Sequence, residues 1–287
     1  MSARSIASAR TIGAVVLALA CTESRDASNS QTAAASPVVT ITSTDYAIEA
    51  PDTLSAGFTV FRLLNHGEEP HEANLVRLEG GRTLPEFIKE YGDAVRTVRP
   101  RPDWAKRLGG PAAFPHAESN ATLYLEPGNY AWVCNVPGPD GVVHVVKHNE
   151  ARAFVVRERS TDSPQPRAPQ PTVSVRLLDY SFRLSAPLTA GKHTVRVEND
   201  GIEPHHLLLF KLAPGKTMED FNAWMQKNMQ GEPPATVAGT MSTLSTGADA
   251  YTEVDLSAGD YVLVCLVAGR DDVPHVAKGM VQQIRID

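Results

Sequence analysis

The sequence predicts an all-β protein made of two tandem β-sandwiches, each with one inserted helix. Three observations lead to this fold class. The chain has 287 residues, a length that suits two domains of ordinary size. Short segments of alternating, β-branched residues recur between turn-forming residues. Most of the chain is also an internal duplication, so the fold of one half should be repeated in the other.

The duplication appears as matching motifs at two fixed offsets. Three motifs return 134 residues later: Asp45-Tyr46 as Asp179-Tyr180, Asn65-x-Gly67 as Asn199-x-Gly201, and Glu69-Pro-His71 as Glu203-Pro-His205. Further along the chain the offset becomes 131, which relates Cys134 to Cys265 and His144 to His275. A single three-residue insertion or deletion in a loop explains the change of offset.

Within each copy most segments read as strands, and one segment reads as a helix. Residues 38–42 and 172–176 are rich in β-branched side chains and largely alternate between apolar and polar residues, which predicts strands. Thr83-x-x-Glu86 and Thr217-x-x-Asp220 are capping patterns that predict a helix start in each copy. We expect irregular loops over the proline-rich residues 96–115 and over their counterpart, residues 231–245.

These elements divide the chain into five parts. We expect a signal peptide, a flexible tether, a first domain, a polar proline-rich linker and a second domain, over residues 1–20, 21–37, 38–158, 159–170 and 171–287.

The first twenty residues predict export. Arg4 and Arg10 precede an apolar run over residues 11–20 that is too short to span a bilayer. Cys21 follows directly, in a pattern that resembles a bacterial lipoprotein signal, which implies a membrane tether through a lipid on this cysteine. The alternative is ordinary cleavage and a soluble periplasmic protein. Either way we expect an exported bacterial protein, periplasmic or anchored to the membrane.

Charge and cysteine content narrow the functional classes. The net charge is -6 and the pI is about 5.9, so the composition does not favour nucleic acid as a partner. Cys134 and Cys265 occupy equivalent positions in the two copies and are not expected to pair with each other. A lone cysteine per domain in an exported protein is either buried and inert or bound to a metal.

The second copy holds the residues for a soft-metal site. These are two imidazoles, one thiol and one thioether, from His205, Cys265, His275 and Met280. Sulfur ligands beside imidazole suit copper better than calcium, magnesium or manganese, and two histidines with one cysteine and a weak axial methionine form a blue-copper site. The alternative is a purely structural role, in which the cysteine is a small buried side chain and the histidine is hydrogen-bonded to the backbone.

Three motifs of this copy resemble the cupredoxin (plastocyanin/azurin) family: Asn199-x-Gly201-x-x-Pro-His205, Gly259-x-Tyr261-x-x-x-Cys265, and His275-x4-Met280. The resemblance implies a Greek-key β-sandwich in each copy. It also implies one type 1 copper in the second copy, with His205, Cys265 and His275 as strong ligands and Met280 axial. His206 competes with His205 but should point to the opposite face of its strand.

The sequence departs from the family pattern between the cysteine and the second histidine. Nine residues intervene there in both copies, whereas small blue copper proteins usually have only a few. A hairpin with its turn at residues 269–272 would bring His275 back to Cys265.

The first copy keeps three of the four candidate ligands, His71, Cys134 and His144. Counting from the histidine, the methionine position holds Asn149, and His148 lies beside it. Asn149 could serve as a weak axial ligand, His148 could replace the missing methionine, or the first copy could have lost its metal site.

Together these residues favour an electron-transfer protein that binds copper and exchanges electrons with a redox partner protein. The alternatives are a copper storage or delivery protein without redox cycling, and a metal-free interaction module. We expect no enzyme, because the paired His-x-His and His-Cys-His motifs of two-domain laccases and the His-Cys pair of copper nitrite reductases are absent.

Overall fold

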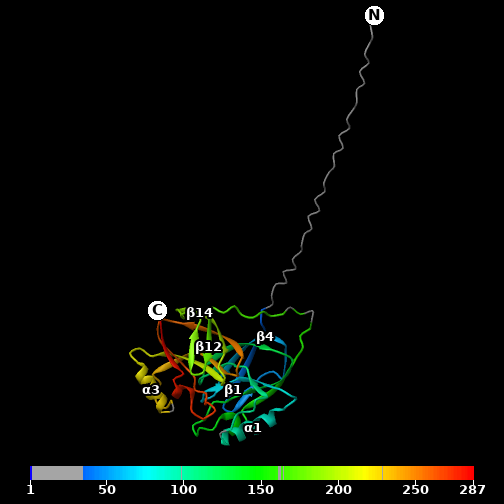
Figure 1. Cartoon of the computed structure of the whole chain (residues 1–287). Coiled ribbons are helices and arrows are strands. Elements are labelled where there is room, and N and C mark those ends of the chain that lie inside the picture. Colours follow the sequence, from blue (N-terminus) through cyan, green and yellow to red (C-terminus); the bar gives the residue numbers. More distant parts are fainter. Residues whose placement is uncertain (2–34, 98, 161–162, 164, 228) are drawn as a thin grey trace. The chain divides into compact units, whose positions relative to one another are not determined.

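The computed structural model describes residue 1 and residues 35–97, 99–160, 163, 165–227 and 229–287. The predicted signal peptide and most of the tether, including Cys21, lie outside these residues. From residue 35 onward the described chain forms one compact unit. Its strands build two β-sandwiches, one from the earlier and one from the later residues (Figure 1). Among the described residues, no helix combines the length and apolar composition needed to cross a bilayer.

The first sandwich contains two layers. One layer has the strand order β2-β1-β4-β9 and the other has the order β3-β11-β10-β6-β7, while β5 and β8 form a separate short pair. The bounds are β1 (Val38–Thr44), β2 (Ala47–Glu49), β3 (Thr53–Ser55), β4 (Gly57–Asn65), β5 (His71–Glu72), β6 (Asn74–Leu78), β7 (Ala105–Arg107), β8 (Ala112–Ala113), β9 (Glu118–Leu125), β10 (Gly128–Val133) and β11 (Ala151–Arg157).

Among the described residues, the second sandwich repeats the two-layer arrangement with four strands in each layer. Its layers have the strand orders β13-β12-β14-β17 and β16-β15-β18-β19. The bounds are β12 (Val173–Leu178), β13 (Ser181–Leu184), β14 (Gly191–Asn199), β15 (His205–Leu212), β16 (Ala235–Leu244), β17 (Asp249–Leu256), β18 (Gly259–Val264) and β19 (Val281–Ile286). In both sandwiches the first strand runs parallel to the third, β1 to β4 and β12 to β14.

The inserted helices are α1 (Leu84–Thr97) and α3 (Met218–Gln226). They explain why the strands that lead to the cysteines are apolar throughout, since these strands are buried on both faces. In β18 Tyr261 and Leu263 face the sandwich core, whereas Val262 and Val264 pack in a separate cluster with Phe221 of α3. In β10 the same alternation places Ala131 and Val133 against α1. Because side chains alternate along a strand, each cysteine that follows points into the sandwich core.

The structure confirms the all-β fold class with two sandwiches and an inserted helix in each. Two further short helical segments appear, α2 (His144–Lys147) and the 3-10 turn η1 (His275–Lys278), each starting at a candidate histidine. The expectation of irregular loop over residues 231–245 is wrong, because β16 occupies Ala235–Leu244 and pairs with β15.

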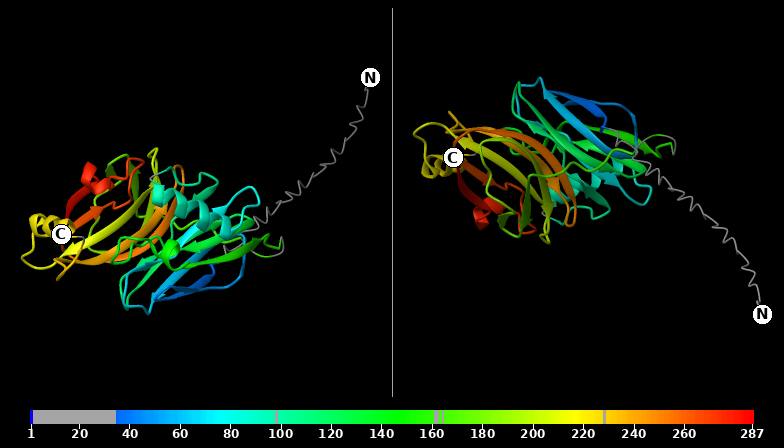
Figure 2. Two further views of the ribbon diagram at one scale, coloured as in Figure 1. Left: turned by 90° about the horizontal axis from the view of Figure 1, so that it is seen from below. Right: turned by 90° about the horizontal axis from the view of Figure 1, so that it is seen from above.

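The two sandwiches are joined edge to edge. β9 of the first pairs with β17 of the second, so their layers form one eight-stranded sheet. The segment before β8 also lies along β16, where the amide of Gly109 donates to the carbonyl of Thr243 at 3.0 Å and that of Ser242 donates to Gly110 at 2.9 Å. Figure 2 shows the two halves side by side from opposite directions.

Candidate metal centres

The first histidine of each centre is positioned by the Asn-x-Gly turn that precedes it. In the second half Asn199 accepts a hydrogen bond from the amide of Gly201 at 2.9 Å and donates to the carbonyls of Glu203 and Leu244, each at 2.9 Å. These bonds fix the chain just before His205, whose side chain is completely buried. Asn65 makes equivalent bonds before His71.

Glycine is required in this turn because of what lies beside it. A Cβ atom at Gly201 would sit 2.5 Å from Oδ1 of Asp179 and 2.6 Å from Nε2 of His205. Asp179 Oδ1 lies 2.9 Å from His205 Nε2, so glycine leaves space for this ion pair. At Gly67 an added Cβ atom would likewise meet Asp45 and His71.

Each cysteine follows the end of a central strand and is shielded from solvent. The amide of His206 donates to Sγ of Cys265 at 3.4 Å, and the amide of Glu72 donates to Sγ of Cys134 at 3.4 Å. Burial raises the pKa of the Cys265 thiol to about 12 and raises that of Cys134 well above its usual value. Both thiols are unpaired. Such groups are poor nucleophiles, and a bound cation would be needed to hold them as thiolates.

The nine-residue segment after each cysteine folds back as a hairpin. In the second half Ala268 bridges Pro274, the amide of Gly269 donates to Val273 at 2.9 Å, and the amide of His275 donates to Val267 at 2.9 Å. The first half repeats the bridge between Pro137 and Val143. The long loop therefore returns the second histidine to the cysteine.

The second-half group brings three of its four predicted ligands together. Sγ of Cys265 lies 3.9 Å from Nδ1 of His205 and 3.6 Å from Nδ1 of His275. The three donor atoms lie within 4.8 Å of one another, and all three side chains are fully buried. His206 stays outside this group, because its Nε2 accepts the amide proton of Leu266 at 2.7 Å.

Met280 is held beside the same group by the backbone. Its amide donates to the carbonyl of His275 at 2.9 Å, and its carbonyl accepts from the amide of Cys265 at 3.1 Å. The side chain is fully buried in the sandwich core. The thioether therefore lies in the same buried region as the other three side chains.

Carboxylates orient the histidines from the outer side. His205 Nε2 lies 2.9 Å from Asp179, and His275 Nε2 lies 2.9 Å from Glu203. A proton held between Nε2 and a carboxylate leaves Nδ1 free to bind a metal, and such partners raise the basicity of the ligand. Burial lowers the pKa of His205, and burial together with the His205 imidazole lowers the pKa of His275, so the neutral ligand form is favoured at both.

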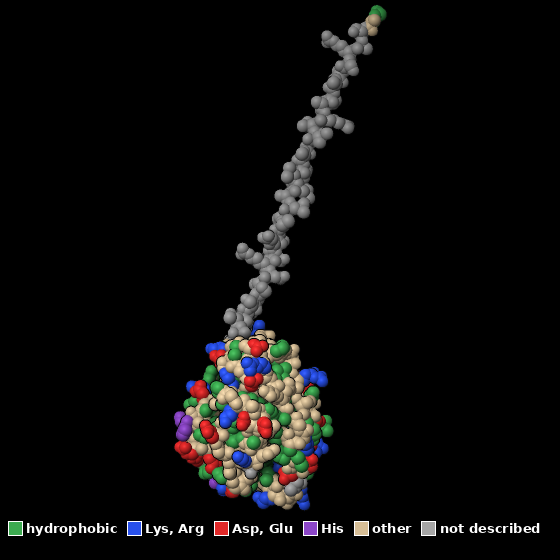
Figure 3. Space-filling model, turned by 90° about the vertical axis from the view of Figure 1, so that its left-hand side faces the viewer, with side chains coloured by type: hydrophobic (Ala, Val, Ile, Leu, Met, Phe, Trp, Pro, Cys, Tyr) green, Lys and Arg blue, Asp and Glu red, His purple; other side chains and the backbone are tan. Residues whose placement is uncertain are grey.

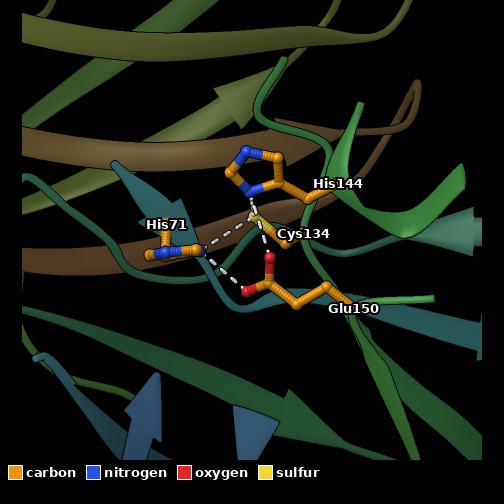
Figure 4. A group of neighbouring side chains, drawn as sticks. All are labelled: His71, Cys134, His144 and Glu150. Atoms are coloured by element: carbon orange, nitrogen blue, oxygen red, sulfur yellow. Dashed lines mark hydrogen bonds and ion pairs between the residues drawn. The ribbon is translucent and has the colours of Figure 1, made fainter. Parts of the chain in front are cut away.

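The first-half group has four members where the sequence predicted three. Sγ of Cys134 lies 3.8 Å from Nδ1 of His71 and 3.5 Å from Nδ1 of His144. Glu150 joins them, and the four donor atoms lie within 4.8 Å of one another. Figure 4 shows the sulfur, the carboxylate and the two ring nitrogens facing one another. Asp45 and Glu69 lie against Nε2 of His71 and His144, at 3.4 and 2.9 Å.

Glu150, and not Asn149, occupies the position of Met280. The carbonyl of Glu150 accepts from the amide of Cys134 at 3.1 Å, which is the bond that Met280 makes to Cys265. The first half forms an α-helical turn after its histidine and the second half a tighter 3-10 turn, so one extra residue is accommodated. Asn149 instead adopts the positive φ of Gly279, and His148 stacks on Tyr46 at 3.5 Å between ring centroids.

The contacts of Glu150 test whether this group suits a metal. Its oxygens lie 2.8 Å from Nδ1 of His71 and 3.0 Å from Nδ1 of His144, yet neither oxygen has a partner in hydrogen-bond alignment. Burial opposes charge here, but the two imidazoles outweigh it and lower the pKa of Glu150. Three donor types thus face one point in a buried site, an arrangement that a cation would satisfy.

The donor sets of both groups fit copper. Two imidazoles and a thiolate are the ligands of a blue-copper site, and the softness of sulfur disfavours calcium, magnesium and manganese. Zinc accepts the same donor types, but structural zinc sites favour closely spaced cysteine pairs, which are absent from this sequence.

Comparison with known proteins gives similarity at the level of solved structures. No family model matches the chain. No curated protein matches it. A reduced auracyanin from Roseiflexus castenholzii is similar with a TM-score of 0.29 and 17% identity, over 44% of this chain and 100% of that one. A Cu-containing nitrite reductase from Thermus scotoductus SA-01 is similar with a TM-score of 0.23 and 13% identity, over 87% of this chain and 61% of that one. A multicopper oxidase is similar with a TM-score of 0.24 and 10% identity, over 87% of this chain and 88% of that one.

These comparisons correct one expectation. The prediction that the chain is not an enzyme is wrong as drawn, because structures named as a nitrite reductase and a multicopper oxidase are among those similar to it. The cupredoxin-like fold itself, in two copies, agrees with the sheets and with the order of the ligands along the chain.

Proposed function

We propose that the chain is an exported copper protein that transfers electrons through the centre formed by His205, Cys265, His275 and Met280. When bound there, copper would supply a one-electron couple between its cuprous and cupric states. The observation that carries the proposal is the convergence of Sγ and two Nδ1 atoms in a fully buried group with both histidines fixed by carboxylates. Ligands held this firmly move little between oxidation states, which favours rapid electron exchange.

The partner in this proposal is another redox protein. The net charge of -6 gives no reason to expect nucleic acid, and on the face in Figure 3 acidic and basic side chains are interspersed. We further propose export through the leader at residues 1–20, with lipid on Cys21 as the tether. Cell fractionation of the full chain tests this: Cys21→Ser should move the mature protein from the membrane to the soluble periplasmic fraction. An intracellular, uncleaved chain would contradict it.

Optical spectroscopy tests the electron-transfer proposal with one centre at a time. The variant Cys134→Ser retains only the second centre, and the double variant Cys134→Ser/Cys265→Ser is its matched control. We expect Cu(II) to give Cys134→Ser an intense thiolate-to-copper absorption that ascorbate bleaches and ferricyanide restores over repeated cycles. The double variant should not show this absorption.

Two other outcomes would overturn the electron-transfer proposal. Tight binding of Cu(I) without the absorption or the reversible cycle would favour a storage or delivery protein. A chain that retains no copper after expression and reconstitution would leave the metal-free interaction module. Metal content per chain, measured on the same samples, distinguishes these two results.

A further inference from the structure

We propose that Glu150 is a metal ligand of the first centre and that it makes the two centres unequal. In a chain that carries copper at both centres and one electron to share, that electron resides on the second centre. This inference rests on the proposed function, because it assigns a direction to electron transfer within one chain. Three observations carry it: the position of Glu150, the charges of the two buried ligand sets, and the hydrogen-bonded connection between the centres.

Glu150 is placed as a ligand by the backbone. Its main-chain bond to Cys134 duplicates the bond that Met280 makes to Cys265, so both side chains leave equivalent positions. The Glu150 side chain is fully buried, and both oxygens face ring nitrogens without a linear hydrogen bond to either. An isolated buried carboxylate is costly, and a shared cation would offset that cost.

The two ligand sets carry different charges into equally buried surroundings. In the first centre the thiolate of Cys134 and the carboxylate of Glu150 would together neutralise a bound cupric ion. In the second centre the thiolate of Cys265 alone would neutralise a bound cuprous ion, because Met280 is uncharged. Since burial penalises net charge, the first centre favours the oxidised state and the second favours the reduced state. Carboxylate oxygen is also a harder donor than thioether sulfur, which acts in the same direction.

A continuous chain of bonded groups links the centres. His71 pairs with Ala113 across β5 and β8, and Thr240 of β16 donates its hydroxyl to the carbonyl of Ala112 at 2.9 Å. β16 then runs to Leu244, which pairs with His205. If both centres held copper, an electron passed along this route would leave the ion held by Cys134 oxidised to the cupric state and the ion held by Cys265 reduced to the cuprous state. No proton or further reactant is needed.

Reduction potentials of single-centre variants test the inequality. Cys265→Ser retains the first centre and Cys134→Ser retains the second, each in the full chain loaded with Cu(II). We expect the first centre to have the lower potential, so that the equilibrium constant for transfer to the second is at least tenfold, which is about 59 mV. Electron paramagnetic resonance of the doubly loaded wild type, given one electron equivalent of ascorbate per chain, should show the signal of the first centre only.

Substitution of Glu150 tests the cause. In the Cys265→Ser background, Glu150→Gln removes the charge at nearly constant shape, and we expect the potential of the first centre to rise and its cupric spectrum to change. The matched control is Met280→Gln in the Cys134→Ser background, which changes no charge and should shift the potential less. If Glu150→Gln binds no copper, Glu150→Asp is the second variant, because it keeps the carboxylate charge. Copper binding by Glu150→Asp but not by Glu150→Gln would support a ligand role for Glu150.

The outcomes separate this inference from the proposed function. A first centre that binds no copper, or whose potential equals or exceeds that of the second, overturns the inference. So does a Glu150→Gln variant with unchanged spectrum and potential. In each of these cases a reversible second centre in Cys134→Ser would still support electron transfer. Loss of the reversible cycle in Cys134→Ser overturns the proposed function itself.

Discussion

At the scale of single residues, each centre combines metal-binding atoms with outer groups that orient them. Asp179 shows this dependence. It lies 2.9 Å from Nε2 of His205 and also accepts the amide of Ile202 at 3.0 Å, so it fixes both the imidazole and the turn beside it. The ligand atoms alone would not define the ring orientation.

Asp179→Asn should weaken copper binding at the second centre by about 10- to 100-fold, since lost outer partners have effects of this size. Competition with a Cu(I) chelator in the Cys134→Ser background measures the affinity. Asp45→Asn is the matched control, because it alters only the first centre and should leave this affinity unchanged. Equal affinity in wild type and Asp179→Asn would argue against the orienting role.

Met280→Leu should retain copper and raise the reduction potential of the second centre. Three strong ligands remain, and removal of a weak donor destabilises the cupric state more than the cuprous state. Spectroelectrochemical titration of Met280→Leu against its parent, in the Cys134→Ser background, gives the shift. Complete loss of copper would count against an axial role for Met280.

The sequence identified the histidines and cysteines but missed Glu150. The histidines and cysteines are the same residue types at fixed offsets in both copies, so aligning the two copies finds them. Glu150 and Met280 differ in residue type and lie at different sequence distances from His144 and His275, so the same alignment misses Glu150. The missing information was the type of turn, α-helical in one half and 3-10 in the other. A signal was present: Asn149 and Gly279 are both residues that tolerate positive φ, and each directly precedes the residue in question. The orienting carboxylates were visible as repeated motifs, but only the fold shows what they contact.

At the scale of elements, the inserted helices cover the outer face of the strands that carry the cysteines. Their starts were predictable from sequence, and the structure contains the capping box of α3, in which Thr217 and Asp220 bond reciprocally. In contrast, β16 escaped prediction because residues 235–244 mix glycine and alanine with few large apolar side chains. Its strand conformation depends on pairing with β15 and on contact with the other half.

The capping carboxylate of α3 predicts a pH dependence. Hydrogen bonds from the amide and hydroxyl of Thr217 lower the pKa of Asp220 below its usual value. A depressed carboxyl pKa contributes stability above the unfolded value of about 3.9, and that contribution is lost as the pH falls through the folded pKa. Asp220→Asn should therefore lower the melting temperature at pH 7, and the difference from wild type should shrink below about pH 4.

Thermal unfolding of the metal-free proteins measures this effect. Glu219→Gln is the control, since Glu219 lies in the same helical turn outside the capping box. A difference between Asp220→Asn and wild type that persists unchanged into the acid range would exclude the carboxylate as its source.

At the scale of the whole molecule, the shared sheet makes the described residues from 35 onward one compact unit. We expect a single thermal transition whose midpoint rises with copper, because ligands that bind only the folded chain stabilise it by mass action, about 2.7 kcal/mol at 100 times the dissociation constant. Calorimetry should show a smaller rise for Cys265→Ser and none for Cys134→Ser/Cys265→Ser. Two separate transitions, each responding to one cysteine, would contradict the coupling.

The junction between the halves has one more consequence. The 131-residue offset carries Asn120 onto Tyr251 and Thr122 onto Glu253. Two contacts cross the junction: Thr122 pairs with Tyr251, and the amide of Glu253 donates to Oδ1 of Asn120 at 2.8 Å. Replacing each residue by its counterpart in the other half turns the first contact into the second. The junction is thus pseudo-twofold and isologous, the arrangement of a symmetric homodimer. Because the two copies are parts of one chain, their association is intramolecular and does not depend on protein concentration. The two copies can also differ in sequence, so that one holds Glu150 and the other holds Met280.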